Sequence, residues 1–89
     1  MNARSTLVKK LDEIIRLESN VSIETLGSYI VGELLGNYDG MYTELNETDP
    51  MARRIGDLAS DLEIANGSEM ELSSMWSEIK RLTEELRQS

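Results

Sequence analysis

The chain has 89 residues, of which 9 are basic and 17 acidic, so its formal net charge is −8. With 39% hydrophobic and 29% charged residues it has the composition of one small globular domain, which excludes a disordered chain and a membrane-spanning protein. Because it contains no Cys and no His, disulfides, zinc sites and imidazole catalysis are excluded as well. An acidic surface repels phosphate groups, so we expect neither nucleic acid nor an anionic membrane as a partner.

Two amphipathic helices are predicted in the first part of the chain. The first covers residues 5–18, and its apolar stripe consists of Leu7, Leu11 and Ile14. The second covers residues 22–35, with Ser22 as its N-cap, and apolar residues occupy more than half of its circumference. Gly27 and Gly32 each cost roughly 1 kcal/mol relative to Ala inside a helix, so we expect both to mark close contact with a neighbouring helix.

A long connection without sustained periodicity is predicted over residues 36–47. It belongs to a window, residues 22–47, that is rich in Asp and Glu, has no Lys or Arg and holds all three tyrosines. Tyr side chains among carboxylates are typical of a protein-binding surface. The residues that we predict to contact a partner are Glu33, Tyr38, Asp39, Tyr42, Glu44 and Glu47. Tyr38 and Tyr42 fit equally well a connection that folds over the bundle.

The most clearly marked helix is predicted over residues 49–66. Thr48 or Asp49 is its N-cap, Pro50 stands at its first position, and Gly67 follows its end. The apolar stripe of this helix consists of Met51, Ile55, Leu58, Leu62 and Ala65. Such a stripe predicts burial against other helices.

A last helix is predicted over residues 69–87, where Ser68 and Glu71 form a capping box. Its apolar stripe consists of Leu72, Met75, Trp76, Ile79, Leu82 and Leu86. Trp76 with Met51, Met70 and Met75 would suit an adaptable binding groove, but the helical spacing favours packing in the core. The predicted fold is therefore all-α: a single domain over residues 1–89, built as a small four-helix bundle with a longer acidic connection between its second and third helices.

No catalytic or metal-binding motif is present. If Gly40 is placed at the glycine position of an EF-hand loop, Leu35 and Asn46 occupy ligand positions, which excludes that calcium site. A bundle of this length has little interior for a substrate cavity. We therefore expect no enzymatic activity, no metal and no cofactor. No segment reaches the roughly 20 apolar residues of a transmembrane helix, and no signal peptide is recognisable, so a cytoplasmic location is expected.

The order of the elements carries a family resemblance. A first helix, the segment SIETLGSYI at residues 22–30, an acidic connection, IGDLASDL at residues 55–62 and a last amphipathic helix containing Glu71 and Leu72 follow one another. This order resembles the small acidic helical immunity proteins of bacteria, of the colicin-D and contact-dependent-inhibition type. In that family the bundle occupies the basic cleft of a nuclease toxin, and its carboxylates take the place of RNA phosphates.

The resemblance implies a protein-binding module that covers a basic surface of a partner, such as the nuclease domain of a toxin, and that acts as an immunity protein or antitoxin. The alternative is a structural or self-associating helical protein without enzymatic function. Heptad-like spacing in the helices at residues 49–66 and 69–87 would suit a homodimer.

Overall fold

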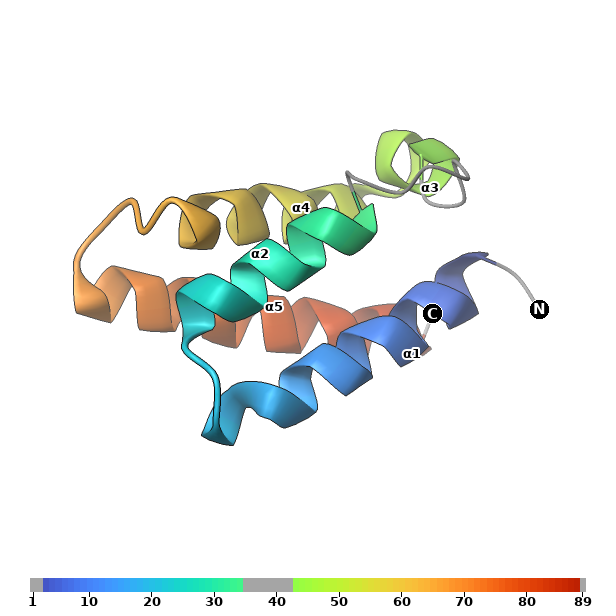
Figure 1. Cartoon of the computed structure of the whole chain (residues 1–89). Coiled ribbons are helices and arrows are strands. Elements are labelled where there is room, and N and C mark those ends of the chain that lie inside the picture. The colour runs from blue at the N-terminus through green and yellow to red at the C-terminus, as the bar shows by residue number, and fades with distance from the viewer. Residues whose placement is uncertain (1–2, 35–42, 89) are drawn as a thin grey trace.

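The computed structural model describes residues 3–34 and 43–88, without the side chains of residues 3, 43, 44 and 46. Its elements are α1 (Ala3–Ile15), the 3₁₀-helix η1 (Arg16–Ser19), α2 (Ile23–Leu34), α3 (Thr43–Thr48), α4 (Pro50–Glu63) and α5 (Glu69–Gln88). The four longer helices pack into one bundle, and the short α3 lies beside the start of α4 (Figure 1). The predicted all-α four-helix fold is confirmed.

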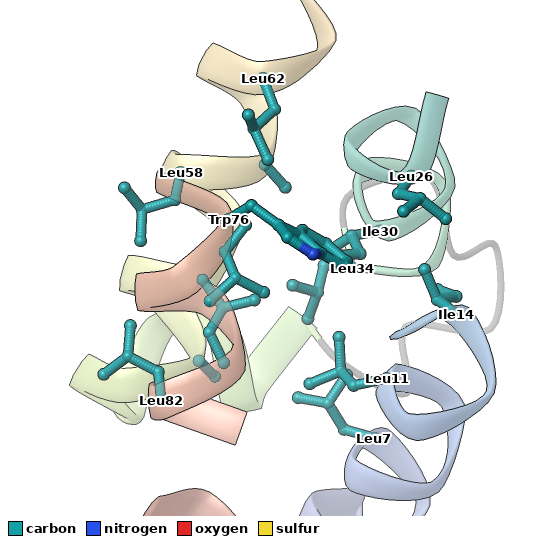
Figure 2. Close-up of a cluster of buried hydrophobic side chains, with 14 of the residues drawn as sticks. Leu7, Leu11, Ile14, Leu26, Ile30, Leu34, Leu58, Leu62, Trp76 and Leu82 are labelled. Carbon is teal, nitrogen blue, oxygen red and sulfur yellow. The ribbon is translucent and has the colours of Figure 1, made fainter. Parts of the chain in front are cut away.

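The core lies between α1, α2, α4 and α5, because each presents its apolar stripe to the others. Its largest fully buried side chains are Leu7, Leu11, Leu26, Ile30, Ile55, Leu62, Ile79, Leu86 and Thr83. The Trp76 ring lies in the middle of the cluster and is only 5% exposed (Figure 2). The helix α4 packs against α2, α5 and α3, so it is the element that holds these three helices together.

Close packing of α2 against α4 depends on Gly27. A Cβ atom at this position would lie 2.7 Å from the Cβ of Leu62 and 2.9 Å from the carbonyl oxygen of Ala59. The prediction that Gly27 marks a close helix contact is therefore confirmed. The same prediction was wrong for Gly32, because no atom of a neighbouring described residue lies within 4 Å of a Cβ built there and Gly32 is exposed.

The start of α4 agrees with the prediction, but its end does not. The Asp49 carboxylate accepts hydrogen bonds from the backbone N–H groups of Met51 (3.0 Å) and Ala52 (3.4 Å), as expected of an N-cap. The helix ends at Glu63 rather than at residue 66, since Ala65 adopts a left-handed conformation with φ 51°. Ala65 is exposed and is not part of the buried stripe.

Two further differences concern short segments, and a third concerns one methionine side chain. The last turn of the predicted first helix is the 3₁₀-helix η1. Residues 43–47 of the predicted connection belong to α3, which has only six residues and therefore shows no periodicity. Core packing is confirmed for Trp76 and, in half-buried form, for Met51 and Met75, but Met70 is 82% exposed.

Candidate partner-binding surface

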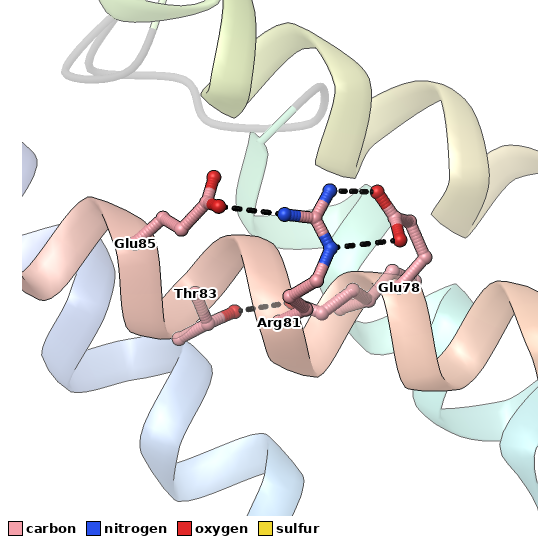
Figure 3. Close-up of polar contacts among 5 residues, drawn as sticks. Glu78, Arg81, Thr83 and Glu85 are labelled. Atoms are coloured by element: carbon pink, nitrogen blue, oxygen red, sulfur yellow. Dashed lines mark hydrogen bonds and ion pairs between the residues drawn. The ribbon is translucent and has the colours of Figure 1, made fainter.

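The ion-paired carboxylates lie mainly on α1, η1 and the C-terminal half of α5. Arg81 of α5 is held between Glu78 and Glu85, three residues before it and four after (Figure 3). The hydrogen bond from Arg81 lowers the pKa of Glu78, and the same bond raises the pKa of Arg81. The remaining pairs are Arg87 with Asp12 and Glu84, Lys80 with Glu18, Lys10 with Glu13, and Arg4 with Asp49. Most of the basic charge of the protein is therefore neutralised along this side.

On this ion-paired side of the molecule, the Glu18 side chain links η1 to α5. Its Oε2 accepts a hydrogen bond of 2.7 Å from the Trp76 indole Nε1 and lies 3.1 Å from Lys80 Nζ. The hydrogen bond from Trp76, followed by that from Lys80, lowers the pKa of Glu18 below its usual value. Because the Trp76 ring belongs to the core, this carboxylate has a structural task and is not free to meet a partner.

A different group of carboxylates has no such partners. In the part of the chain that the structure describes, no ion pair is formed by Glu24, Glu33, Glu47, Asp57, Asp61, Glu63, Glu69 or Glu71. These residues belong to α2, to α3, to α4 and to the first turn of α5. From residue 17 to residue 79 the sequence has only Arg53 and Arg54 as basic residues. Because both arginines stand in the first half of α4, negative charge accumulates on α2, on α3 and on the second half of α4.

The predicted contact residues can be placed only in part. Glu33 is half-buried in the last turn of α2, and Glu47 is exposed on α3. We call these two residues the α2–α3 surface; α2 ends and α3 begins at the same end of the bundle (Figure 1). Glu44 lies in α3, but its side chain is outside the description, as are the residues Tyr38, Asp39 and Tyr42. Their role stays a prediction.

Asp49 fixes the backbone that carries Glu47. It is 5% exposed, caps α4 and forms an ion pair with Arg4 of α1. Burial raises the pKa of Asp49, but the hydrogen bonds from Arg4, Ala52 N–H and Met51 N–H outweigh it, so the pKa lies below its usual value. The Asp49 N–H also donates to the carbonyl of Leu45, 2.8 Å away, and Leu45 packs on the core. As a result, α3 is tied to α1 and α4 while Glu47 faces solvent.

The turn between α4 and α5 forms a second surface that the sequence prediction missed. Asp61, Glu63 and Glu69 lie within a few residues of two exposed apolar side chains, Ile64 and Met70. We call these five residues the α4–α5 surface. A signal for it was present, because residues 55–79 contain no Lys or Arg although they hold Asp57, Asp61, Glu63, Glu69, Glu71 and Glu78.

The residues that the structure describes form neither a metal site nor a membrane-spanning helix. No group of three or more Asp or Glu side chains there is arranged to hold a metal ion. None of the helices there is both long and apolar enough to cross a membrane. Comparison of the chain with known protein families, with curated proteins and with solved structures found no match.

Proposed function

We propose that this protein is an acidic protein-binding module that covers a basic surface of a partner protein. The observation that supports the proposal is the separation of its charges: among the described side chains, the carboxylates of α1 and of the C-terminal half of α5 are paired, whereas those of α2, α3, α4 and the first turn of α5 are not. Unpaired carboxylates on one side of a small protein attract a cationic partner, speed its association and select it over neutral or acidic proteins.

The partner that fits this chemistry most concretely is the nuclease domain of a toxin. A nuclease binds phosphates with Lys and Arg, and a rigid acidic bundle offers carboxylates in place of those phosphates. In this proposal the protein acts as an immunity protein or antitoxin that blocks the nuclease cleft. Glu33 and Glu47 contribute charge to the interface, and Asp39 and Glu44 add to it. Tyr38 and Tyr42 serve as its aromatic anchors.

Self-association is the second candidate, and the exposure of Ile64 and Met70 favours it. Apolar side chains that face solvent are buried when two copies of a protein pack together. Salt separates the two candidates, because a complex held by charge weakens as salt rises, whereas an apolar homodimer does not.

The experiment uses three immobilised baits in lysate of the source cell, each eluted with a salt gradient and read by mass spectrometry. The first bait is the wild type, and the second carries Glu33→Lys with Glu47→Lys. The third carries Glu13→Lys with Glu84→Lys, which changes the net charge equally but on α1 and α5, where both residues belong to exposed ion pairs. Such pairs contribute about 0–1 kcal/mol, so the fold is retained.

A basic protein should be retained by the wild type and by the control, be lost from the Glu33 and Glu47 bait, and elute as salt rises. Its ability to cleave RNA should fall when the wild-type protein is added. If all three baits return only this chain, at an associated mass that salt leaves unchanged, the self-associating function replaces the proposed one.

A further inference from the structure

The largest exposed apolar side chains lie on the α4–α5 surface. Among the described residues, Ile64 is 68% and Met70 is 82% exposed, against 46% for Tyr29 and 40% for Leu17. Ile64 follows the last residue of α4, and Met70 is the second residue of α5, so both lie at the same end of the bundle (Figure 1). Two apolar side chains with this exposure, placed on either side of one interhelical turn, suit the anchors of a protein interface.

The backbone between the two anchors is fixed by hydrogen bonds at both helix ends. At the end of α4, the N–H of Ala65 donates to the Leu62 carbonyl (3.0 Å) and the N–H of Asn66 to the Asp61 carbonyl (3.1 Å), which is a Schellman motif. At the start of α5, a capping box joins two residues through a pair of 3.2 Å hydrogen bonds. Its members are Ser68 and Glu71. The anchors therefore stand on a preorganised turn, which lowers the entropy cost of binding.

The charges around the anchors determine which occupant fits. Asp61, Glu63 and Glu69 form no ion pair among the described residues. A second copy that used the same surface would bring these carboxylates against their own copies, which disfavours a homodimer through this surface although Ile64 and Met70 are exposed. An anionic lipid surface would repel these carboxylates as well. A segment that combines apolar side chains with Lys or Arg satisfies both the anchors and the acidic rim.

We propose that the α4–α5 surface binds a basic amphipathic helix of a partner protein, with Ile64 and Met70 as its apolar anchors. Met70 suits this task because its unbranched side chain adapts to the shape of the partner. The α4–α5 surface lies at the opposite end of α4 from Glu47 (Figure 1). It is therefore a second contact region, and the proposal for it does not depend on the proposed function.

The probe is a synthetic peptide of Leu and Lys, about 18 residues or five helical turns long, with all Leu on one face. A peptide of the same composition with Leu spread around the helix is the control. The double variant Ile64→Ser with Met70→Ser removes the anchors, and Glu63→Gln with Glu69→Gln removes charge from the rim. Leu17→Ser removes an exposed apolar side chain elsewhere on the molecule, and circular dichroism verifies that each variant is folded.

The wild type should bind the amphipathic peptide more tightly than its control, with NMR shift changes centred on residues 61–72. The anchor variant should lose about tenfold or more in affinity, because each anchor is buried on binding. The rim variant should bind more weakly, mainly at low salt, and Leu17→Ser should change nothing. The variant Glu33→Lys with Glu47→Lys should still bind the peptide, so a failure of the proposed function would not be mistaken for a failure of this surface.

Two results would overturn the proposal. The first is an anchor variant that binds the peptide within about twofold of the wild type, which is less than burial of even one such side chain would produce. The second is a wild-type protein whose sedimentation shows a dimer that the anchor variant abolishes, because a second copy of the chain is then the occupant.

Discussion

The contact between α2 and α4 predicts opposite effects for the same substitution at two glycines of one helix. At Gly27 a new Cβ would meet the Leu62 Cβ at 2.7 Å and the Ala59 carbonyl oxygen at 2.9 Å, and the latter atom is backbone that moves only with α4. Overpacking of this kind costs about 1–3 kcal/mol, and the higher helix propensity of Ala returns about 1 kcal/mol. We therefore expect Gly27→Ala to lower the free energy of unfolding by up to about 2 kcal/mol.

Gly32→Ala is the matched control. Among residues 3–34 and 43–88, nothing lies within 4 Å of its new Cβ, so the change in helix propensity dominates, and the free energy of unfolding should rise by about 0.5–1 kcal/mol. Urea unfolding followed by circular dichroism measures both values, and for a domain of this size 1 kcal/mol corresponds to a shift in Tm of roughly 4–8 °C. If Gly27→Ala were as stable as Gly32→Ala, the helices would not be in the close contact described.

Three further substitutions test individual polar or backbone features. Ala65→Gly should raise the free energy of unfolding by up to about 1 kcal/mol, because Gly adopts the left-handed conformation at the end of α4 without steric cost; urea unfolding measures it. Asp49→Asn keeps the N-cap but loses the ion pair with Arg4. Because folding lowers the pKa of Asp49, the wild type should be more stable than Asp49→Asn at pH values above the usual pKa of 3.8. This difference in the free energy of unfolding should vanish as the pH falls through the pKa of the folded state. Glu18→Ala should abolish an acid titration of the fluorescence of Trp76, which in the wild type occurs below pH 4.5.

The sequence predicted features that depend on neighbouring residues only. The N-caps Asp49 and Ser68 were predictable, because a capping side chain bonds to backbone groups two or three residues away. The end of α4 was not, because the left-handed position is occupied by Ala65, and the usual signal, a glycine, comes two residues later at Gly67.

Features that depend on tertiary packing were beyond the sequence. Gly27 lies on the buried side of α2 with Ile30 and Leu34, whereas Gly32 is exposed, and how closely α4 approaches Gly27 depends on tertiary packing. The exposure of Met70, in contrast, could have been predicted from the sequence. Met70 precedes the exposed Ser77 by two helical turns, so a strict reading of the period would have placed it outside the core.

The candidate site was predictable as charge but not as shape. Counting basic residues identified the acidic window that contains Glu33 and Glu47, and the same count identifies residues 55–79. The pairing of charges depends on contacts between residues far apart in the sequence, such as Arg87 with Asp12. For this reason the division into a neutralised side and an acidic side emerged only from the structure.

The most direct test of the proposed function is the affinity of this protein for the basic partner that the wild-type bait retains, measured by calorimetry at low and high salt. The comparison variant carries Asp39→Lys, Glu44→Lys and Glu47→Lys. We predict that the affinity of the wild type falls as salt rises and that the variant keeps its helical circular dichroism signal but no longer binds. An unchanged affinity of the variant, together with no effect of salt, would contradict a function based on the acidic surface.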